Sequence, residues 1–163
     1  MCADPRGARP VLRDAAAADD PFLRLLFAAT HGEFGVLPAE LADSIMAHQY
    51  EMRERQYRAR YPTMVDKVIE IDGRPTGRLS VAEVDDGSVI VVVDIAVLPE
   101  AQRRGIASAT LAHLMSCADE RRASIELSVA ADSRAVELYR RLGFASSVHA
   151  GNSAYLLMWR APG

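Results

Sequence analysis

An almost unbroken apolar run from Val89 to Leu98 constrains the fold of this chain more than any other feature. Only Asp94 interrupts the run, and Pro99 ends it. A strand that is apolar at nearly every position is typical of the centre of a sheet covered on both faces. Shortly after the proline, Gly105 precedes a stretch with apolar residues at helical spacing. A buried strand, a glycine turn and a helix in this order indicate an α/β domain.

Alternating apolar residues and turn residues around this run predict a mixed sheet of seven strands, most of them antiparallel. The strands are expected at Val11–Arg13, Met64–Ile71, Gly77–Val84, Ser88–Leu98, Ser124–Val129, Ser146–Ala150 and Ala154–Trp159. The last two strands form a hairpin that turns at Gly151-Asn152. The helix between the fourth and fifth strands implies a right-handed crossover, so these two strands should be parallel neighbours.

Two of about four helices are expected before the second strand. The first begins at Pro21, and its apolar face is expected to contain Phe22, Leu25, Leu26 and Ala29. The second runs from near Pro38 to Arg60, and its apolar side is expected to contain Leu41, Ile45, either His48 or Gln49, and Met52. The arginine-rich half of this helix is expected to face solvent.

Two further helices are expected on either side of the fifth strand. One follows Gly105 and ends near Arg122. The other begins at Asp132, whose side chain can cap its first turn, and ends at Gly143.

The length of 163 residues fits a single domain, expected at residues 11–163 after a flexible leader at 1–10. A formal net charge of −3 argues against nucleic acid as the main partner. The apolar runs are too short to span a membrane, and no export signal is expected. Cys2 and Cys117 fit neither a disulfide framework nor a zinc site, so a cytoplasmic location is expected. The sequence leaves a homodimer open.

The segment Gln102-Arg103-Arg104-Gly105-Ile106-Ala107 connects the apolar strand to the following helix. A glycine turn at this place exposes unpaired backbone N–H groups beside the positive end of the helix dipole. Such a turn suits a diphosphate. Taken alone, the string also fits an ordinary strand-to-helix turn with exposed arginines.

This segment resembles motif A of the GCN5-related N-acetyltransferases (GNAT), Gln/Arg-x-x-Gly-x-Gly/Ala after an apolar strand and a proline. The run from Ala135 to Phe144 is similar to a second signature of the family, Ala-x-x-Leu-Tyr-x-x-x-Gly-Phe. The order of strands and helices agrees over residues 11–160. The resemblance implies the GNAT fold, a mixed, mostly antiparallel seven-stranded sheet with about four helices and splayed central parallel strands.

The resemblance also implies an acetyl-CoA-dependent enzyme that needs no metal. It would transfer the acetyl group to a primary amine of a small molecule or peptide by direct attack in a ternary complex. The alternative is a non-catalytic acyl-CoA-binding or regulatory module. The implied contacts of the pantetheine arm are the backbone groups of Ile95, Ala96 and Val97. The implied contacts of the pyrophosphate are Arg103, Arg104, Gly105, Ile106, Ala107 and Ser108.

The resemblance implies that Tyr139 stands near the coenzyme sulfur, where its phenol could donate a proton to the departing thiolate. The alternative is a half-buried tyrosine that only packs. Where Asp132 stands many members have Asn, so a coenzyme contact by Asp132 is not carried over. Some members also have a glutamate on the fifth strand where Ser128 stands.

The general base is left open among four candidates, because an amine acceptor must lose a proton before it attacks. The candidates are Asp94, Glu126, Glu33 and His31. Asp94 interrupts an apolar run, so it is either a buried carboxylate with partners or a functional one. We take Asp94 as the catalytic candidate beside Tyr139.

The acceptor site is expected between the loop after the first helix, the second helix and the last hairpin. The expected contacts are Glu33, Phe34, Tyr57 and Tyr61. No activated nucleophile is expected, because Cys117 lies within a helix with no histidine placed to activate it. His48, His113 and His149 lack metal-ligand spacing.

Overall fold

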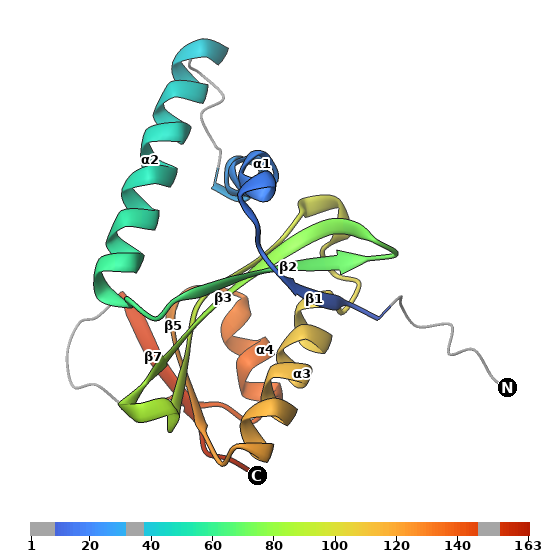
Figure 1. The fold of residues 1–163 in the computed structure, drawn as a ribbon, viewed down its shortest axis with the longest axis vertical. Coiled ribbons are helices and arrows are strands. Elements are labelled where there is room, and N and C mark those ends of the chain that lie inside the picture. Colours follow the sequence, from blue (N-terminus) through green and yellow to red (C-terminus); the bar gives the residue numbers. More distant parts are fainter. Residues whose placement is uncertain (1–8, 32–37, 147–153) are drawn as a thin grey trace, which may run out of the picture.

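The computed structural model describes residues 9–31, 38–146 and 154–163 (Figure 1). It contains one mixed sheet in the order β1-β2-β3-β4-β5-β7-β6. The strands are β1 (Val11–Asp14), β2 (Val65–Ile71), β3 (Arg74–Val84), β4 (Val89–Val97), β5 (Ser124–Ala130), β6 (Ala145–Ser146) and β7 (Tyr155–Arg160). The pair β4 and β5 is parallel and every other pair is antiparallel. The predicted mixed seven-stranded sheet is confirmed, while the turn of the last hairpin lies outside the described residues.

Two helices lie on each face of the sheet. The helices are α1 (Asp20–His31), α2 (Ala39–Arg60), α3 (Ile106–Glu120) and α4 (Ala135–Arg141). Figure 1 shows α1 and α2 on one face of the sheet and α3 and α4 on the other. The main apolar core lies between the sheet, α3 and α4, and its fully buried members include Leu79, Leu111, Ile125 and Met158. A smaller apolar cluster joins α1 to α2.

The buried faces of α1 and α2 differ from those predicted. In α1 the buried side chains are Leu23, Leu26 and Phe27, whereas Leu25 and Ala29 are exposed. In α2 the buried residues are Met46 and Tyr50, whereas Leu41 and Met52 are exposed. The prediction was wrong because the two helices bury a small apolar contact with each other, while α2 meets the sheet through charged side chains.

The sheet surface beneath α2 is polar. The strand register places Asp66, Ser80 and Asp94 side by side on β2, β3 and β4. Next to this row, the buried Arg78 of β3 donates to both oxygens of Glu54, at 2.6 and 2.9 Å, and to Oδ1 of Asp66, at 2.7 Å. The Arg78 side chain is only 2% exposed. The prediction that the charged half of α2 is solvated is right for Arg55, Arg58 and Arg60, which are exposed. It is wrong for Glu54, which points inward to this arginine.

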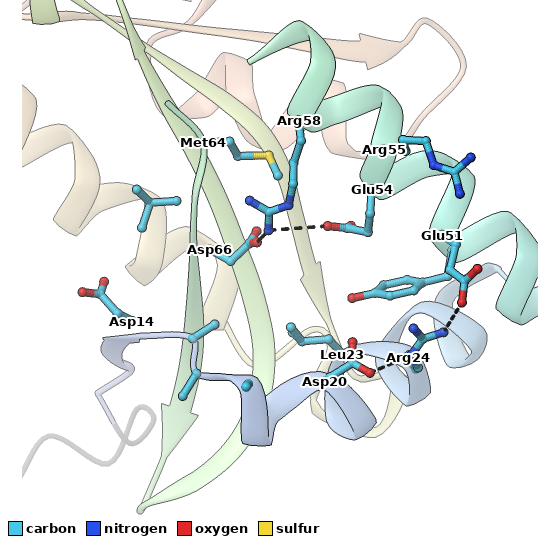
Figure 2. Close-up of a pocket in the computed structure, with 15 residues that line it drawn as sticks. Asp14, Asp20, Leu23, Arg24, Glu51, Glu54, Arg55, Arg58, Met64 and Asp66 are labelled. Atoms are coloured by element: carbon cyan, nitrogen blue, oxygen red, sulfur yellow. Dashed lines mark hydrogen bonds and ion pairs between the residues drawn. The ribbon is translucent and has the colours of Figure 1, made fainter. Parts of the chain in front are cut away.

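Arg58, one turn after Glu54, also reaches this polar row. Its Nη2 donates to Oδ2 of Asp66 at 2.6 Å, and Figure 2 shows it extending from α2 toward β2. Burial acts to raise the pKa of Asp66, but the hydrogen bond from Ser80 and the charge of Arg78 outweigh it and hold that pKa below its ordinary value. The carboxylate is therefore ionised, as its arginine partners require.

The start of α4 differs from the prediction at one residue. The residue before the first turn is Arg134, and the backbone N–H of Ala135 donates to Oγ of Ser133 at 3.2 Å. Asp132 is exposed and does not cap the helix. At the other end Gly143 takes a φ of 87°. Its left-handed conformation ends the helix, as predicted.

Candidate active site

The parallel strands β4 and β5 pair over only part of their length. Their ladder runs from Val89 opposite Ser124 to Val92 opposite Leu127 and then ends. Beyond this point β4 continues against β3, with Asp94 opposite Ser80, and β5 continues against β7. Val93 is the extra residue of a bulge in β4, because Ser80 and Val81 pair with Asp94 and Val92. Beyond Val92 and Leu127, the facing edges of β4 and β5 have no ladder hydrogen bonds to each other. Their backbone groups are therefore free to hydrogen-bond an extended ligand.

The segment after β4 forms an open cradle of backbone N–H groups. Arg103 and Gly105 both adopt left-handed conformations, with φ of 64° and 78°. The backbone N–H of Gln102 still has a backbone partner, the carbonyl of Pro99. The next N–H with a backbone partner is that of Ala109, which donates to the Gly105 carbonyl at 2.9 Å. The N–H groups of residues 103–108 thus have no backbone partner among the described residues. They lie at and just before the start of the fifteen-residue α3, where the helix dipole favours an anion.

A cavity of about 210 Å³ adjoins this cradle. Its lining residues are Val97, Ala101, Gln102, Arg103, Gly105, Ile106, Ala107, Ser108, Leu138 and Arg141. A Cβ atom added at Gly105 would meet no atom within 4 Å, so the space in front of the turn is open. Open space, unpaired N–H groups and nearby arginines together fit a diphosphate. These residues include five of the six predicted for the pyrophosphate, and Val97 from the predicted pantetheine contacts. The sixth, Arg104, lines a separate cavity beside Ile71 and Thr76.

Two motif residues without a predicted role, Gln102 and Leu138, help to build the site. The Nε2 group of Gln102 donates to the carbonyl of Val97 at 2.9 Å, which ties the cradle to the end of β4. Leu138 brings α4 to the opposite wall of the cavity. Gly77 of β3 was also missed. A Cβ atom at this position would lie 2.5 Å from the Ala96 carbonyl oxygen. β3 can therefore approach this part of β4 only with glycine at 77.

Tyr139 lies on α4 and is 6% exposed. Its ring packs edge-on against Phe144, with centroids 5.8 Å apart. Burial, and to a smaller extent the charge of Asp94, raise the pKa of Tyr139 to about 12. Among the described residues, no side chain hydrogen-bonds to its hydroxyl. The phenol is therefore protonated at neutral pH and available to donate to a ligand.

Asp94 is 15% exposed and forms an ion pair with Arg53 of α2. Arg53 Nη2 donates to Oδ2 of Asp94 at 3.0 Å. The sequence left two alternatives for Asp94, a buried carboxylate with partners or a functional one. The structure shows the first of these features, because Arg53 is the partner that a buried carboxylate requires. Asp94 also lies beyond the last paired residues of β4 and β5, whereas Glu126 lies within the ladder, opposite Val91.

Arg53 connects Asp94 to two other predicted residues. Its Nη1 lies 3.1 Å from Nε2 of His31, and its guanidinium lies 5.4 Å from the ring centre of Tyr57. Burial is the main reason that the pKa values of His31 and Tyr57 shift, downward for His31 and upward for Tyr57. The structure thus brings His31, Tyr57 and Asp94 together around an arginine that the sequence analysis left in a solvated face.

The other predicted acceptor residues are less informative. Tyr61 follows the last turn of α2, and its hydroxyl accepts a hydrogen bond from Nε of Arg60 at 3.0 Å. Glu33 and Phe34 lie outside the described residues, as does His149. One statement about nucleophiles is corrected: His113 does stand beside Cys117, with Nε2 and Sγ 3.9 Å apart. At 1.5 Å per residue, His113 and Cys117 lie about 12 and 18 Å along α3 from Gly105, so the pair is remote from the cradle.

A second cavity, of about 760 Å³, lies between α1, α2 and β2, and Asp66 of the polar row is one of its lining residues (Figure 2). Its walls carry ion pairs such as Arg24 with Asp20 and Arg24 with Glu51. It contains none of the residues predicted for coenzyme or catalysis. The chemistry of the cradle and of Asp94 is therefore a better guide to the site than cavity size.

No three His, Cys, Asp or Glu side chains of residues 9–31, 38–146 and 154–163 gather as metal ligands. None of the four helices has the length and apolar character of a membrane span over the residues described.

Several solved structures share this fold. The PaiA N-acetyltransferase from Thermoplasma acidophilum in complex with coenzyme A superposes with a TM-score of 0.68 at 13% identity, covering 93% of this chain and 98% of the other. The ribosomal-protein-S18-alanine N-acetyltransferase from Escherichia coli gives 0.66 at 17% identity, covering 94% of each chain. The spermidine N-acetyltransferase from Vibrio cholerae in complex with CoA and spermine gives 0.66 at 17%, covering 94% and 96%.

The sequence comparisons give a family but no individual relative. No curated protein matches the chain. A family model described as the acetyltransferase (GNAT) family matches residues 27–144, which span both predicted motifs. The resemblance and the fold class predicted from the sequence are thereby confirmed. Because the matched region is more than half of the chain, this protein belongs to the GNAT family of acetyltransferases.

Proposed function

We propose that this acetyltransferase transfers the acetyl group of acetyl-CoA to a primary amine by direct attack in a ternary complex. The observation that carries the proposal is the arrangement at the opened end of β4. The Gly105 cradle begins the helix on one face of the sheet, and the carboxylate of Asp94 meets α2 on the other face. Donor and acceptor can therefore reach the same strand end from opposite sides.

We assign Asp94 as the group that accepts a proton from the acceptor. An alkyl amine resembles the lysine side chain, whose pKa is about 10.4, so it arrives at neutral pH as an ammonium ion. The ammonium ion must lose one proton before its nitrogen can attack the acetyl carbon. As the new C–N bond forms and the C–S bond breaks, the nitrogen loses a second proton. One of the two protons ends on the coenzyme thiol and the other goes to solvent.

We assign Tyr139 as a hydrogen-bond donor to the departing sulfur. With a pKa of about 12, its phenol is a weaker acid than a thiol near 8.5. Complete proton transfer to the thiolate is therefore unfavourable by itself. A hydrogen bond that strengthens as negative charge develops on the sulfur lowers the barrier without such a transfer.

The acceptor site is proposed on the α1 and α2 side, with Tyr57, Tyr61, Glu33 and Phe34 as its contacts. The aromatic side chains suit an apolar or aromatic acceptor, and Glu33 suits a cationic one. Two of the structural neighbours are named for an alanine of ribosomal protein S18 and for spermidine as their acceptors. A test panel should therefore include phenethylamine, spermidine and a peptide with a free N-terminal alanine.

We also propose that the enzyme acts in the cytoplasm, because the spacing of its two cysteines fits no disulfide framework and so suits a reducing compartment.

The rival function is a non-catalytic acyl-CoA-binding module. Release of coenzyme A thiol from acetyl-CoA in the presence of the amine panel distinguishes the two. Amine-dependent release that is lost in Asp94→Asn supports the proposal. Coenzyme A binding without release by any amine would favour the module.

A further inference from the structure

Arg53 of α2 is held by more contacts than a surface arginine needs. Its side chain is 18% exposed, and its guanidinium lies 4.6 Å from the ring centre of Phe27 and 5.4 Å from that of Tyr57. Nη2 donates to Asp94, and Nη1 faces Nε2 of His31 at 3.1 Å. The two rings and the imidazole fix the plane of the guanidinium, so its direction toward Asp94 is fixed as well.

His31 can serve this arrangement only as a neutral imidazole. Its Nδ1 lies 3.1 Å from the carbonyl of Phe27, a contact that requires the proton on Nδ1. Nε2 is then an acceptor and takes the hydrogen bond from Arg53. The Phe27 and His31 rings also stack, with centroids 4.4 Å apart. Arg53 is therefore positioned by α1 as well as by its own helix.

The ion pair leaves one oxygen of Asp94 for other use. Arg53 bonds Oδ2, and no other described side chain hydrogen-bonds to Asp94. A carboxylate with one oxygen anchored keeps few rotamers, and its second oxygen then points in one direction. That is the requirement for a group that must meet the proton of an ammonium ion with fixed geometry.

The ion pair of Arg53 with Asp94 is not needed to attach α2 to the sheet. Glu54 and Arg58 already attach the helix to Arg78 and Asp66 of the neighbouring strands. Nε of Arg53 is buried and has no hydrogen-bond partner among the described residues, which is a cost to stability. A buried ion pair is also often no more stable than apolar side chains of similar size. The charge of Arg53 therefore needs a reason other than packing.

We infer that Arg53 is a positioning residue for acetyl transfer, which holds Oδ2 of Asp94 so that Oδ1 faces the acceptor amine. The inference rests on the proposed function, because it requires Asp94 to accept the proton.

The test compares Arg53→Met, Arg53→Lys and Asp94→Asn with the double variant Arg53→Met/Asp94→Asn. Turnover is measured at saturating acetyl-CoA with the most active amine of the panel, and coenzyme A affinity is measured for every variant. Arg58→Met is the matched control, because Arg58 is also an α2 arginine paired with a strand carboxylate. We expect kcat to fall about 10- to 100-fold in Arg53→Met, with coenzyme A affinity within twofold of wild type. Lysine should restore part of the loss, and the control should keep its kcat within twofold.

The double variant gives the sharper result. If Arg53 acts through Asp94, adding Arg53→Met to Asp94→Asn should lower kcat by less than twofold. Losses that multiply in the double variant, or full kcat in Arg53→Met, would overturn the inference. Should Arg53→Met lose coenzyme A binding through misfolding, the same cycle run with Arg53→Lys decides. Full activity in Asp94→Asn would overturn the assignment of Asp94. The proposed function itself fails only if wild type releases no thiol with any amine of the panel, so the two failures are distinguishable.

Discussion

Replacement of Arg78 by methionine tests the polar contact between α2 and the sheet. The guanidinium is 2% exposed and compensates two carboxylates, Glu54 and Asp66, whose side chains are 16% and 9% exposed. Methionine fills a similar volume but leaves both carboxylates without their shared partner. Removal of one member of a buried ion pair costs about 3–5 kcal/mol in the free energy of unfolding. For a chain of this size that corresponds to a fall in Tm of about 6–20 °C.

Urea unfolding followed by circular dichroism at pH 7 measures this loss. Arg58→Met is the control, because Arg58 pairs with the same Asp66 but is 56% exposed. An exposed pair contributes about 0.2–1 kcal/mol, so the control should remain close to wild type. The reasoning is refuted if Arg78→Met loses less than about 1 kcal/mol, or if both variants lose equally. A triple variant that also replaces Glu54 and Asp66 by Leu and Asn should regain much of the stability.

Three further predictions concern single residues. Gly77→Ala should lower stability by about 1–3 kcal/mol, because its Cβ would lie 2.5 Å from the Ala96 carbonyl oxygen; a Tm equal to wild type would contradict this. Tyr139→Phe removes the proposed hydrogen bond to the departing sulfur and should lower kcat about 100-fold, while acetyl-CoA affinity and Tm stay nearly constant. Full activity where chemistry limits the rate would refute the assignment of Tyr139. His31→Gln should reduce the pH dependence of stability. Burial and the charge of Arg53 hold the pKa of His31 below its ordinary 6.5, so the unfolded chain binds the proton more readily. The urea midpoint of wild type should therefore fall as the pH drops below about 6.5, and that of the variant should fall less. Equal falls of the two midpoints would contradict a lowered pKa of His31 in the folded protein.

The elements of the sheet could be predicted from the sequence because their signals are local. The β4 run, the turn at Gly105 and the stop at Gly143 each depend on residues that are close together in the chain. The parallel pairing of β4 with β5 followed from the handedness of the crossover. The early end of their ladder at Val92 followed only from the family resemblance, since no local pattern marks it.

The faces of α1 and α2 could not be predicted by the same reasoning. The sequence pattern predicts one apolar face for each helix, but the sheet surface that α2 meets carries Asp66, Arg78 and Asp94. The inward side of α2 is therefore charged, and Leu41 and Met52 remain exposed. A charged helix face that pairs with strand residues distant in sequence is indistinguishable from a solvated one until the strands are aligned. For that reason Arg53 was missed while Asp94, which interrupts an apolar run, was found.

The central claim is that acetyl-CoA binds with its diphosphate at the Gly105 cradle. Titration calorimetry of acetyl-CoA with wild type, Gly105→Glu and Gly73→Glu tests it most directly. Both glycines have a positive φ, 78° and 72°, and neither has an atom within 4 Å of an added Cβ, so the two variants carry matched backbone strain. The account predicts binding to wild type and Gly73→Glu, and loss of binding in a folded Gly105→Glu, whose carboxylate meets the diphosphate. Equal affinity in Gly105→Glu, or no binding by wild type, would contradict it.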